Sequence, residues 1–264
     1  MAFLTHPVLP LLTVNRLSMD FGGIRAIDQL DIRIKPGEIV ALIGPNGAGK
    51  TTFFNCLTGL YTPTSGELLW TPPNRSGRRL NGLKPHQITE QGLARTFQNI
   101  RLFSNMTVLE NVMIGRHCRT RATVFGAIFR PSSVMQEEQT TIGTSFALLE
   151  RVGLANLAHE RAGNLPYGAQ RRLEIARALA TDPLLLLLDE PAAGMNPQEG
   201  QDLEALIRSI HSDGVAILLI EHDMQLVMRL ADHIFVLDYG RLIAEGTPEA
   251  IRNNPAVIKA YLGE

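Results

Sequence analysis

A phosphate-binding loop is predicted between Gly44 and Thr51, where the chain fits the pattern G-x-x-x-x-G-K-[ST]. Glycines let a backbone turn tightly and direct its N–H groups at an anion, and a helix beginning near Lys50 would add the positive end of its dipole. The Lys50 ammonium suits β- and γ-phosphates, and the Thr51 hydroxyl is a hard oxygen ligand for Mg²⁺. The alternative, a plain glycine turn, explains neither the lysine nor the hydroxyl. The predicted polyphosphate contacts are Gly44, Pro45, Asn46, Gly47, Ala48, Gly49, Lys50, Thr51 and Thr52.

Two carboxylates, Asp189 and Glu190, follow the apolar run from Leu184 to Leu188. An apolar run without alternation predicts a strand of a parallel sheet that is covered on both faces. In nucleotide hydrolases with such a loop, the aspartate after this strand helps to hold Mg²⁺. Glu190 is then placed to polarise an attacking water.

A second apolar run, Val215 to Ile220, leads into Glu221, His222 and Asp223. His222 at the end of that strand could hydrogen-bond a γ-phosphate, although a single histidine in such a place is more often structural. Phe21, at a turn, could stack on a base, although a hairpin phenylalanine is the better interpretation of the residue alone. An isolated Gln98 in a loop indicates no chemistry by itself.

The remaining pattern predicts the elements that position these residues. Strands are expected at 11–19, 24–34 and 67–70, and helical periodicity covers 85–161 with interruptions at 98–103 and 120–133. A further helix is expected at 170–180. A basic cluster of Arg116, His117, Arg119 and Arg121 is interpreted as a solvated face rather than a site for an acidic partner.

The composition is that of an ordinary globular chain: 264 residues, 45% hydrophobic and 19% charged. Lys and Arg total 25 against 26 Asp and Glu, so no global charge attracts nucleic acid or anionic lipid. Cys56 and Cys118 have no metal-site spacing, which favours a reducing compartment. The apolar runs are too short to span a bilayer and the start lacks a basic signal-peptide region, so a cytoplasmic protein is expected.

Taken in the order in which they occur along the chain, the motifs resemble those of the nucleotide-binding subunit of an ABC transporter, from Leu11 to Glu264. The resemblance implies an α/β fold: a P-loop NTPase with a RecA-like core, an antiparallel β subdomain and an inserted α-helical subdomain. It implies one ABC ATPase domain over 1–264. Residues 11–97 and 181–264 would form the core with the β subdomain, and 98–180 the helical subdomain with the signature segment.

The resemblance also implies roles for single residues, with ATP and Mg²⁺ as cofactors. Phe21 is the adenine-stacking residue, and Gln98 reaches the metal and the attacking water while sensing the membrane partner. Asp189 holds Mg²⁺ through water, Glu190 is the general base and His222 is the γ-phosphate switch. Thr51, Gln98 and Asp189 form the metal set, and Gly168 in the signature segment contributes to nucleotide binding.

Longer strings narrow the resemblance to the ATPases of branched-chain amino-acid importers. They lie at 97–103, 191–197, 221–224 and 261–264. The implied function is ATP hydrolysis that powers uptake of branched-chain or related amino acids, at the inner face of the cell membrane. The implied partners are permease subunits, a second ATPase subunit and, indirectly, a substrate-binding protein outside the membrane; nucleic acid is not one of them.

Three alternatives remain at this level. One is the ATPase of a lipopolysaccharide-type exporter, whose carboxyl-terminal ending is similar. Another is an ABC ATPase that acts on nucleic acid or ribosomes, but such chains usually carry two cassettes or a long coiled-coil insertion. The third is a binding-only module, against which the presence of Lys50, Asp189, Glu190 and His222 argues.

The chain departs from the general ABC pattern in two places. The signature, usually Leu-Ser-Gly-Gly-Gln, is Leu-Pro-Tyr-Gly-Ala at 165–169, so Pro166 removes a hydroxyl that would donate to a γ-phosphate. Asn196 replaces the usual aspartate of the D-loop. Both departures fit a heterodimer with two unequal ATP sites, while a homodimer in which Pro166 is a harmless variant is the other interpretation.

Overall fold

The chain folds as two compact units in the computed structural model, which describes residues 9–73, 75–119 and 132–262. One unit combines residues 1–85 with 208–264 and is called the terminal unit. The other comprises residues 86–207 and is called the central unit. None of the helices in the described ranges is both long and apolar enough to cross a membrane.

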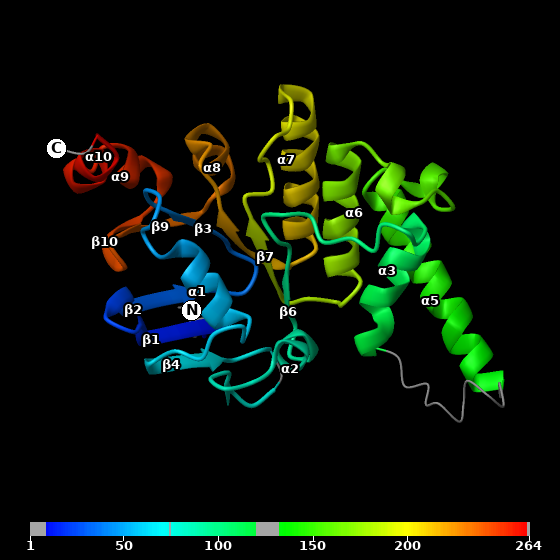
Figure 1. The fold of residues 1–264 in the computed structure, drawn as a ribbon, viewed down its shortest axis with the longest axis horizontal. Coiled ribbons are helices and arrows are strands. Elements are labelled where there is room, and N and C mark those ends of the chain that lie inside the picture. The colour runs from blue at the N-terminus through cyan, green and yellow to red at the C-terminus, as the bar shows by residue number, and fades with distance from the viewer. Residues whose placement is uncertain (1–8, 74, 120–131, 263–264) are drawn as a thin grey trace, which may run out of the picture. The chain divides into compact units, whose positions relative to one another are not determined.

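An antiparallel sheet occupies the first part of the terminal unit (Figure 1). Its strands are β1 Leu12–Phe21, β2 Ile24–Ile34, β4 Ser65–Trp70 and β5 Arg78–Arg79, in the order β2-β1-β4-β5. Along β2, Leu30, Ile32 and Ile34 are buried and the residues between them are exposed. This alternation is typical of a sheet with one covered face. The strands predicted at 11–19, 24–34 and 67–70 are confirmed.

A mainly parallel set of strands forms the second part of the terminal unit. These strands are β3 Ile39–Ile43, β8 Ala216–Ile220, β9 His233–Asp238 and β10 Arg241–Gly246. β3 pairs in parallel with β8 and with β9, and β10 is antiparallel to β9. All five residues of β3 and of β8 are buried, as an unbroken apolar run predicts.

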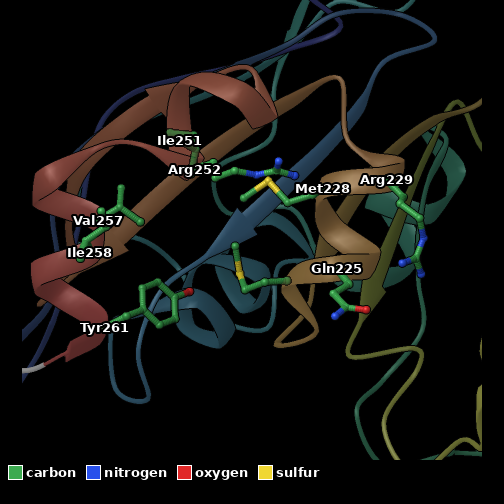
Figure 2. A pocket seen from close by; sticks show the side chains of 9 residues that line it. Gln225, Met228, Arg229, Ile251, Arg252, Val257, Ile258 and Tyr261 are labelled. Atoms are coloured by element: carbon green, nitrogen blue, oxygen red, sulfur yellow. The ribbon is translucent and has the colours of Figure 1, made fainter.

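Short helices flank these strands. They are α1 Lys50–Leu57, α8 Met224–Leu230, α9 Pro248–Arg252 and α10 Pro255–Leu262. Asp223 caps α8 by accepting from the Gln225 and Leu226 N–H groups. A groove of about 550 Å³ lies between α8 and the last two helices. Figure 2 shows Met228 on one side of it and Val257 and Tyr261 on the other. Val257 also belongs to the apolar cluster that contains Ala41 and Ile43 of β3, so the carboxyl-terminal helix packs on the strand that leads into the phosphate loop.

The central unit has one parallel strand pair and a set of helices. The strands are β6 Leu93–Arg95 and β7 Leu185–Asp189. The helices are α2 Pro85–Glu90, α3 Val108–Arg116, α5 Ser132–Arg151, α6 Tyr167–Leu179 and α7 Pro197–Ser212, with short 3₁₀ turns at His117–Arg119, Ala155–Leu157 and Ala162–Asn164. α3 starts with a capping box in which Thr107 and Glu110 satisfy each other's backbone N–H groups. α2 begins at the last residue of the terminal unit's first segment, and α7 ends in its second segment.

The structure differs from the predicted elements in two places within this unit. α6 begins at Tyr167, three residues before the predicted start, because Pro166 occupies the cap position, where a missing N–H removes no helical hydrogen bond. β6 lies in a stretch predicted to be helical. The prediction is wrong there because a strand of three residues is too short to show an alternating pattern in the sequence. The interruption expected at 98–103 is confirmed. Most of the one expected at 120–133 lies outside the described residues.

The packing of α3 on α6 generates a stability prediction. A Cβ at Gly115 would overlap the Arg177 carbonyl oxygen and lie 3.0 Å from the Ala180 Cβ. We therefore expect Gly115→Ala to lower the free energy of unfolding by about 1–3 kcal/mol, as overpacking does. Gly143→Ala in α5, where an added Cβ meets nothing within 4 Å, is the control. It should raise stability by about 0.5–1 kcal/mol through helix propensity. Denaturant unfolding of both variants measures the difference, and equal midpoints would contradict the close approach of the two helices.

Candidate functional site

The predicted phosphate loop has a backbone that only glycine adopts without strain. Gly44, Gly47 and Gly49 have φ angles of 150°, 82° and 99°. A Cβ on Gly44 would overlap the Leu237 carbonyl oxygen, and one on Gly49 would lie 2.6 Å from the Ala26 carbonyl oxygen. Gly49 caps α1 without any side-chain hydrogen bond, so the first N–H groups of this helix are not satisfied by a capping side chain. The loop and helix start together form a geometry suited to an anion.

Lys50 lies back over this loop. Its ammonium donates to the carbonyl oxygens of Gly44 at 2.7 Å and Pro45 at 3.0 Å, and the residue is only 7% exposed. Thr51 is exposed and Thr52 is partly buried. Tyr261 of α10 reaches the same loop: burial raises the pKa of its hydroxyl, and a hydrogen bond with the Gly44 backbone opposes that rise. The carboxyl-terminal helix therefore contacts the first glycine of the loop.

The other two predicted residues of the terminal unit lie at the ends of strands. Phe21 ends β1, is 42% exposed, and packs edge-on against Tyr61 with ring centroids 5.2 Å apart. One aromatic face is therefore held in place at the surface. His222 follows β8 and is exposed, and its backbone N–H donates to the buried carboxylate of Glu221 at 3.0 Å.

In the central unit, Asp189 forms a buried ion pair. Its Oδ2 lies 2.7 Å from Nη2 of Arg95, and the two side chains are 3% and 6% exposed. The two residues end the neighbouring parallel strands β7 and β6, so the strand pairing brings them together. The Asp189 N–H also lies 3.4 Å from the Thr96 hydroxyl. The carboxylate is thus fixed in one orientation beside a permanent positive charge.

Glu190 and Gln98 contact each other directly. The Gln98 amide nitrogen donates to Oε2 of Glu190 at 2.9 Å, across 92 residues of sequence. Glu190 has a φ angle of 47°, a left-handed conformation that costs a residue with a Cβ about 1 kcal/mol or more. Strain of this kind is concentrated at functional sites. The structure therefore unites the glutamine and the glutamate, which the residue types alone did not connect.

The signature segment and the D-loop also contact each other. Gly168 is buried at the start of α6, and a Cβ there would overlap the carboxylate of Glu199. Glu199 and Asn196 exchange two hydrogen bonds of 3.0 Å between side chains and backbone N–H groups, which caps α7. Asn196 thus supplies the side-chain oxygen that this cap needs, without the negative charge of an aspartate.

Comparison with known proteins decides the family. Residues 27–193, more than half of the chain, match the family described as ABC transporter. The chain belongs to the ABC transporter family. Residues 241–264 of this ABC ATPase also match the family described as branched-chain amino acid ATP-binding cassette transporter.

Individual relatives of the ABC ATPase cover nearly its whole length. The high-affinity branched-chain amino acid transport ATP-binding protein LivG of Escherichia coli K12 is 49% identical over 256 residues, 97% of this chain and 98% of its own. BraF of Pseudomonas aeruginosa, with the same description, is 47% identical with the same coverage of 97% and 98%. These relatives support the importer interpretation and not the exporter or nucleic-acid alternatives.

Solved structures confirm the predicted fold class. The ADP conformation of MJ1267, an ATP-binding cassette of an ABC transporter, matches with a TM-score of 0.82 and 30% identity, covering 97% of this chain and 100% of that one. The dimeric ABC transporter cassette MJ0796 matches with a TM-score of 0.74 and 25% identity, covering 90% and 98%. Both are cassettes of the P-loop type, and the α/β architecture with its antiparallel sheet agrees with them.

In this ABC ATPase, the prediction that the basic cluster at 116–121 is a solvated face is wrong for two of its arginines. Arg116 pairs with Asp182 at 2.8 Å, and Arg119 donates to the Thr181 carbonyl oxygen at 2.7 Å. Both side chains therefore hold α3 and the turn after it against the end of α6. Arg121 lies outside the described residues.

The ion pair beneath Asp189 generates a second prediction. Arg95→Met would leave a buried carboxylate without its cation, so we expect a loss of about 3–5 kcal/mol in the free energy of unfolding. Arg101→Met is the control because Arg101 is exposed and lies over the Phe97 ring at 4.4 Å, a contact worth about 0.5–1 kcal/mol at an exposed site. Chemical denaturation followed by circular dichroism measures both. An Arg95→Met midpoint no lower than that of Arg101→Met would show that the pair is not needed to hold Asp189.

Proposed function

We propose that this ABC ATPase binds MgATP and hydrolyses it to power uptake of branched-chain or related amino acids through a separate permease. The descriptions of relatives that are 49% and 47% identical support the substrate class. The observation that carries the hydrolytic part is the 2.9 Å hydrogen bond between Gln98 and Glu190. This bond orients the carboxylate of a residue whose backbone is in the left-handed conformation.

Nucleotide binding is assigned to the terminal unit. The backbone N–H groups from Gly44 to Thr52 and the start of α1 would receive the phosphates. Lys50 would exchange its hydrogen bonds to two loop carbonyls for charge-assisted bonds to the β- and γ-phosphates. Phe21 would stack on the adenine with the face that Tyr61 leaves exposed.

The metal set proposed from the sequence suits Mg²⁺ in its donor chemistry. Thr51 offers a hydroxyl and Asp189 a carboxylate. Gln98 offers its amide oxygen, since its amide nitrogen donates to Glu190. Mg²⁺ usually keeps several waters and takes few protein ligands besides substrate phosphates, which this small set of oxygens fits. Bound there, the ion would neutralise charge that develops on the phosphates.

Glu190 is proposed as the general base. Its carboxylate would accept a proton from the attacking water, while Gln98 keeps it oriented and positions the water. His222 would hydrogen-bond the γ-phosphate and report its presence to α8 through the adjacent Asp223 cap.

For domain organisation, we assign residues 11–97 and 181–264 to the nucleotide-binding core with its β subdomain and 98–180 to the helical subdomain.

Glu190→Gln tests the assignment of the base. The amide has the shape of the carboxylate but cannot accept the proton, so turnover should fall by about 10²–10⁴-fold while ATP still binds. Lys50→Ala should instead abolish ATP binding. Phosphate release by the permease complex and equilibrium binding of labelled ATP separate the two effects. A Glu190→Gln variant that hydrolyses ATP at the parental rate would exclude Glu190 as the base.

The partners are proposed from the resemblance and from one surface. A groove of about 650 Å³ in the central unit is lined by Phe103, Ile114 and Arg177, and two of these, Phe103 (49%) and Ile114 (37%), are exposed apolar side chains. Arg101, three residues from Gln98, also lines it. We assign this groove to an intracellular segment of the permease, which would place the ATPase at the inner face of the membrane. A substrate-binding protein would act through the permease.

The second ATPase subunit would complete each ATP site. In a sandwich dimer the segment at 165–169 faces nucleotide bound by the opposite subunit, so Pro166 would weaken only the partner's site. Gly168 and the first turn of α6 keep an N-terminal helix dipole there. A heterodimer with unequal sites follows if the partner carries a complete signature.

Pro166→Ser tests this inequality. A restored hydroxyl adds one hydrogen bond to a charged phosphate, worth about 1.5–3 kcal/mol, which is roughly tenfold or more in ATP occupancy. In the reconstituted heterodimer, the substitution should change turnover when the partner's phosphate-loop lysine is intact. It should be silent when only Lys50 remains. Equal effects in the two backgrounds, or an active homodimer of this chain, would exclude the unequal-site arrangement.

A further inference from the structure

One buried arginine of α6 holds the backbone of the loop that carries Gln98. Arg171 is 0% exposed, and its guanidinium donates to the carbonyl oxygens of Phe97 at 2.5 Å and Gln98 at 2.8 Å. A planar guanidinium presents several donors in a fixed geometry, so two successive carbonyls can be held at once. The 98–103 loop can therefore be held without being buried, because the long Arg171 side chain extends to it from α6.

A buried glutamate of the same helix holds the loop by accepting hydrogen bonds from its backbone N–H groups. Glu174 is 1% exposed and pairs with Arg171 at 2.8 Å. Its Oε1 accepts from the backbone N–H groups of Phe97 at 3.2 Å and Arg101 at 3.4 Å. Burial raises the pKa of Glu174, and the charge of Arg171 opposes that rise. Carbonyls and N–H groups of one loop are therefore both attached to one ion pair.

The same arginine is also attached to the signature segment. Arg171 Nη2 donates to the Tyr167 hydroxyl at 3.2 Å, and the Tyr167 residue is 44% exposed. The ring lies against the D-loop as well, since a Cβ on Gly194 would be 3.5 Å from its Cε1. Tyr167 occupies a signature position where the general family pattern has glycine, so this three-way contact depends on the departure from that pattern.

We propose that Tyr167 and Arg171 are positioning residues that transmit the placement of the first turn of α6 to Gln98, and through Gln98 to Glu190. The proposal rests on the proposed function, in which this turn faces the nucleotide of the opposite subunit. Binding of that nucleotide would displace the Tyr167 hydroxyl. Arg171 would pass the displacement to the Phe97 and Gln98 carbonyls, and the Gln98 amide would pass it to the general base. The state of one ATP site would thereby set the orientation of the carboxylate in the other.

The test uses the full chain in its permease complex, with Tyr167→Phe, Arg171→Lys and the double variant. Tyr167→Phe removes only the hydroxyl. Arg171→Lys keeps the charge but loses the planar set of guanidinium donors that holds two carbonyls at once. We expect kcat to fall about threefold and tenfold respectively, with the KM for ATP within twofold of the parent, because loss of one bond to a charged group is worth about tenfold or more. The double variant should be no slower than Arg171→Lys alone, since the tyrosine acts through the arginine.

Arg172→Lys is the matched control, because it is the same substitution one position along the same helix and the residue touches neither carbonyl. It should leave kcat and KM unchanged. Additive effects of Tyr167→Phe and Arg171→Lys, or a rise in KM with unchanged kcat, would overturn the relay. If Arg171→Lys does not fold, Tyr167→Phe alone decides: a parental kcat would overturn the proposal.

Hydrogen exchange separates failure of the relay from failure of the proposed function. The N–H groups of Phe97 and Arg101 should exchange roughly tenfold faster in Arg171→Lys and be unchanged in Arg172→Lys, whatever the catalytic role of Gln98. Faster exchange with an unchanged kcat would uphold the attachment of the loop but overturn the relay, because the proposed catalytic role of Gln98 would then have failed. A lowered kcat without faster exchange would overturn the relay itself.

Discussion

Strands that are buried on both faces force the polar chemistry of this chain to their ends. Every residue of β3, β7 and β8 is buried, so no polar side chain is accommodated along them except at the last position. β3 leads directly to Gly44, β7 ends at Asp189, and β8 leads to Glu221 and His222. In parallel sheets, ligand sites form at the carboxyl ends of the strands. The apolar runs therefore determine which residues are available for chemistry before any motif is considered.

The sequence predicted those parts of the site in which the signal is local. The glycine spacing from Gly44 to Gly49 is needed by the backbone itself, because a Cβ at either of these two ends meets a carbonyl oxygen. The contact between Gln98 and Glu190 could not be predicted from the residues alone, because 92 positions separate them and an isolated loop glutamine gives no local signal of its partner. Family resemblance named both residues without saying that they touch. Arg95 received no role at all, because its importance appears only when β6 and β7 pair.

Two buried ion pairs in the central unit hold the groups around them in fixed positions. Arg95 with Asp189, and Arg171 with Glu174, each remove two charges from water, and apolar residues of similar volume would cost less. Apolar residues, however, cannot form the hydrogen bonds that fix the orientation of a neighbouring group. Asp189 is aimed by its arginine, and the loop around Phe97 is held by hydrogen bonds from both partners of the second pair. In this unit, charge is buried where a backbone or a carboxylate has to be oriented.

The two hydrogen bonds that Lys50 makes to the carbonyls of Gly44 and Pro45 set a threshold on the charge of an incoming anion. Any anion must first detach the ammonium from these acceptors, so its gain is the difference between two sets of bonds and not the full strength of the new one. A monophosphate offers the oxygens of a single phosphoryl group for that exchange. A triphosphate offers several oxygens at once to the lysine, the loop N–H groups and the start of α1. An anion with several phosphates therefore compensates for the lost Lys50 bonds better than an anion with one, whatever base it carries.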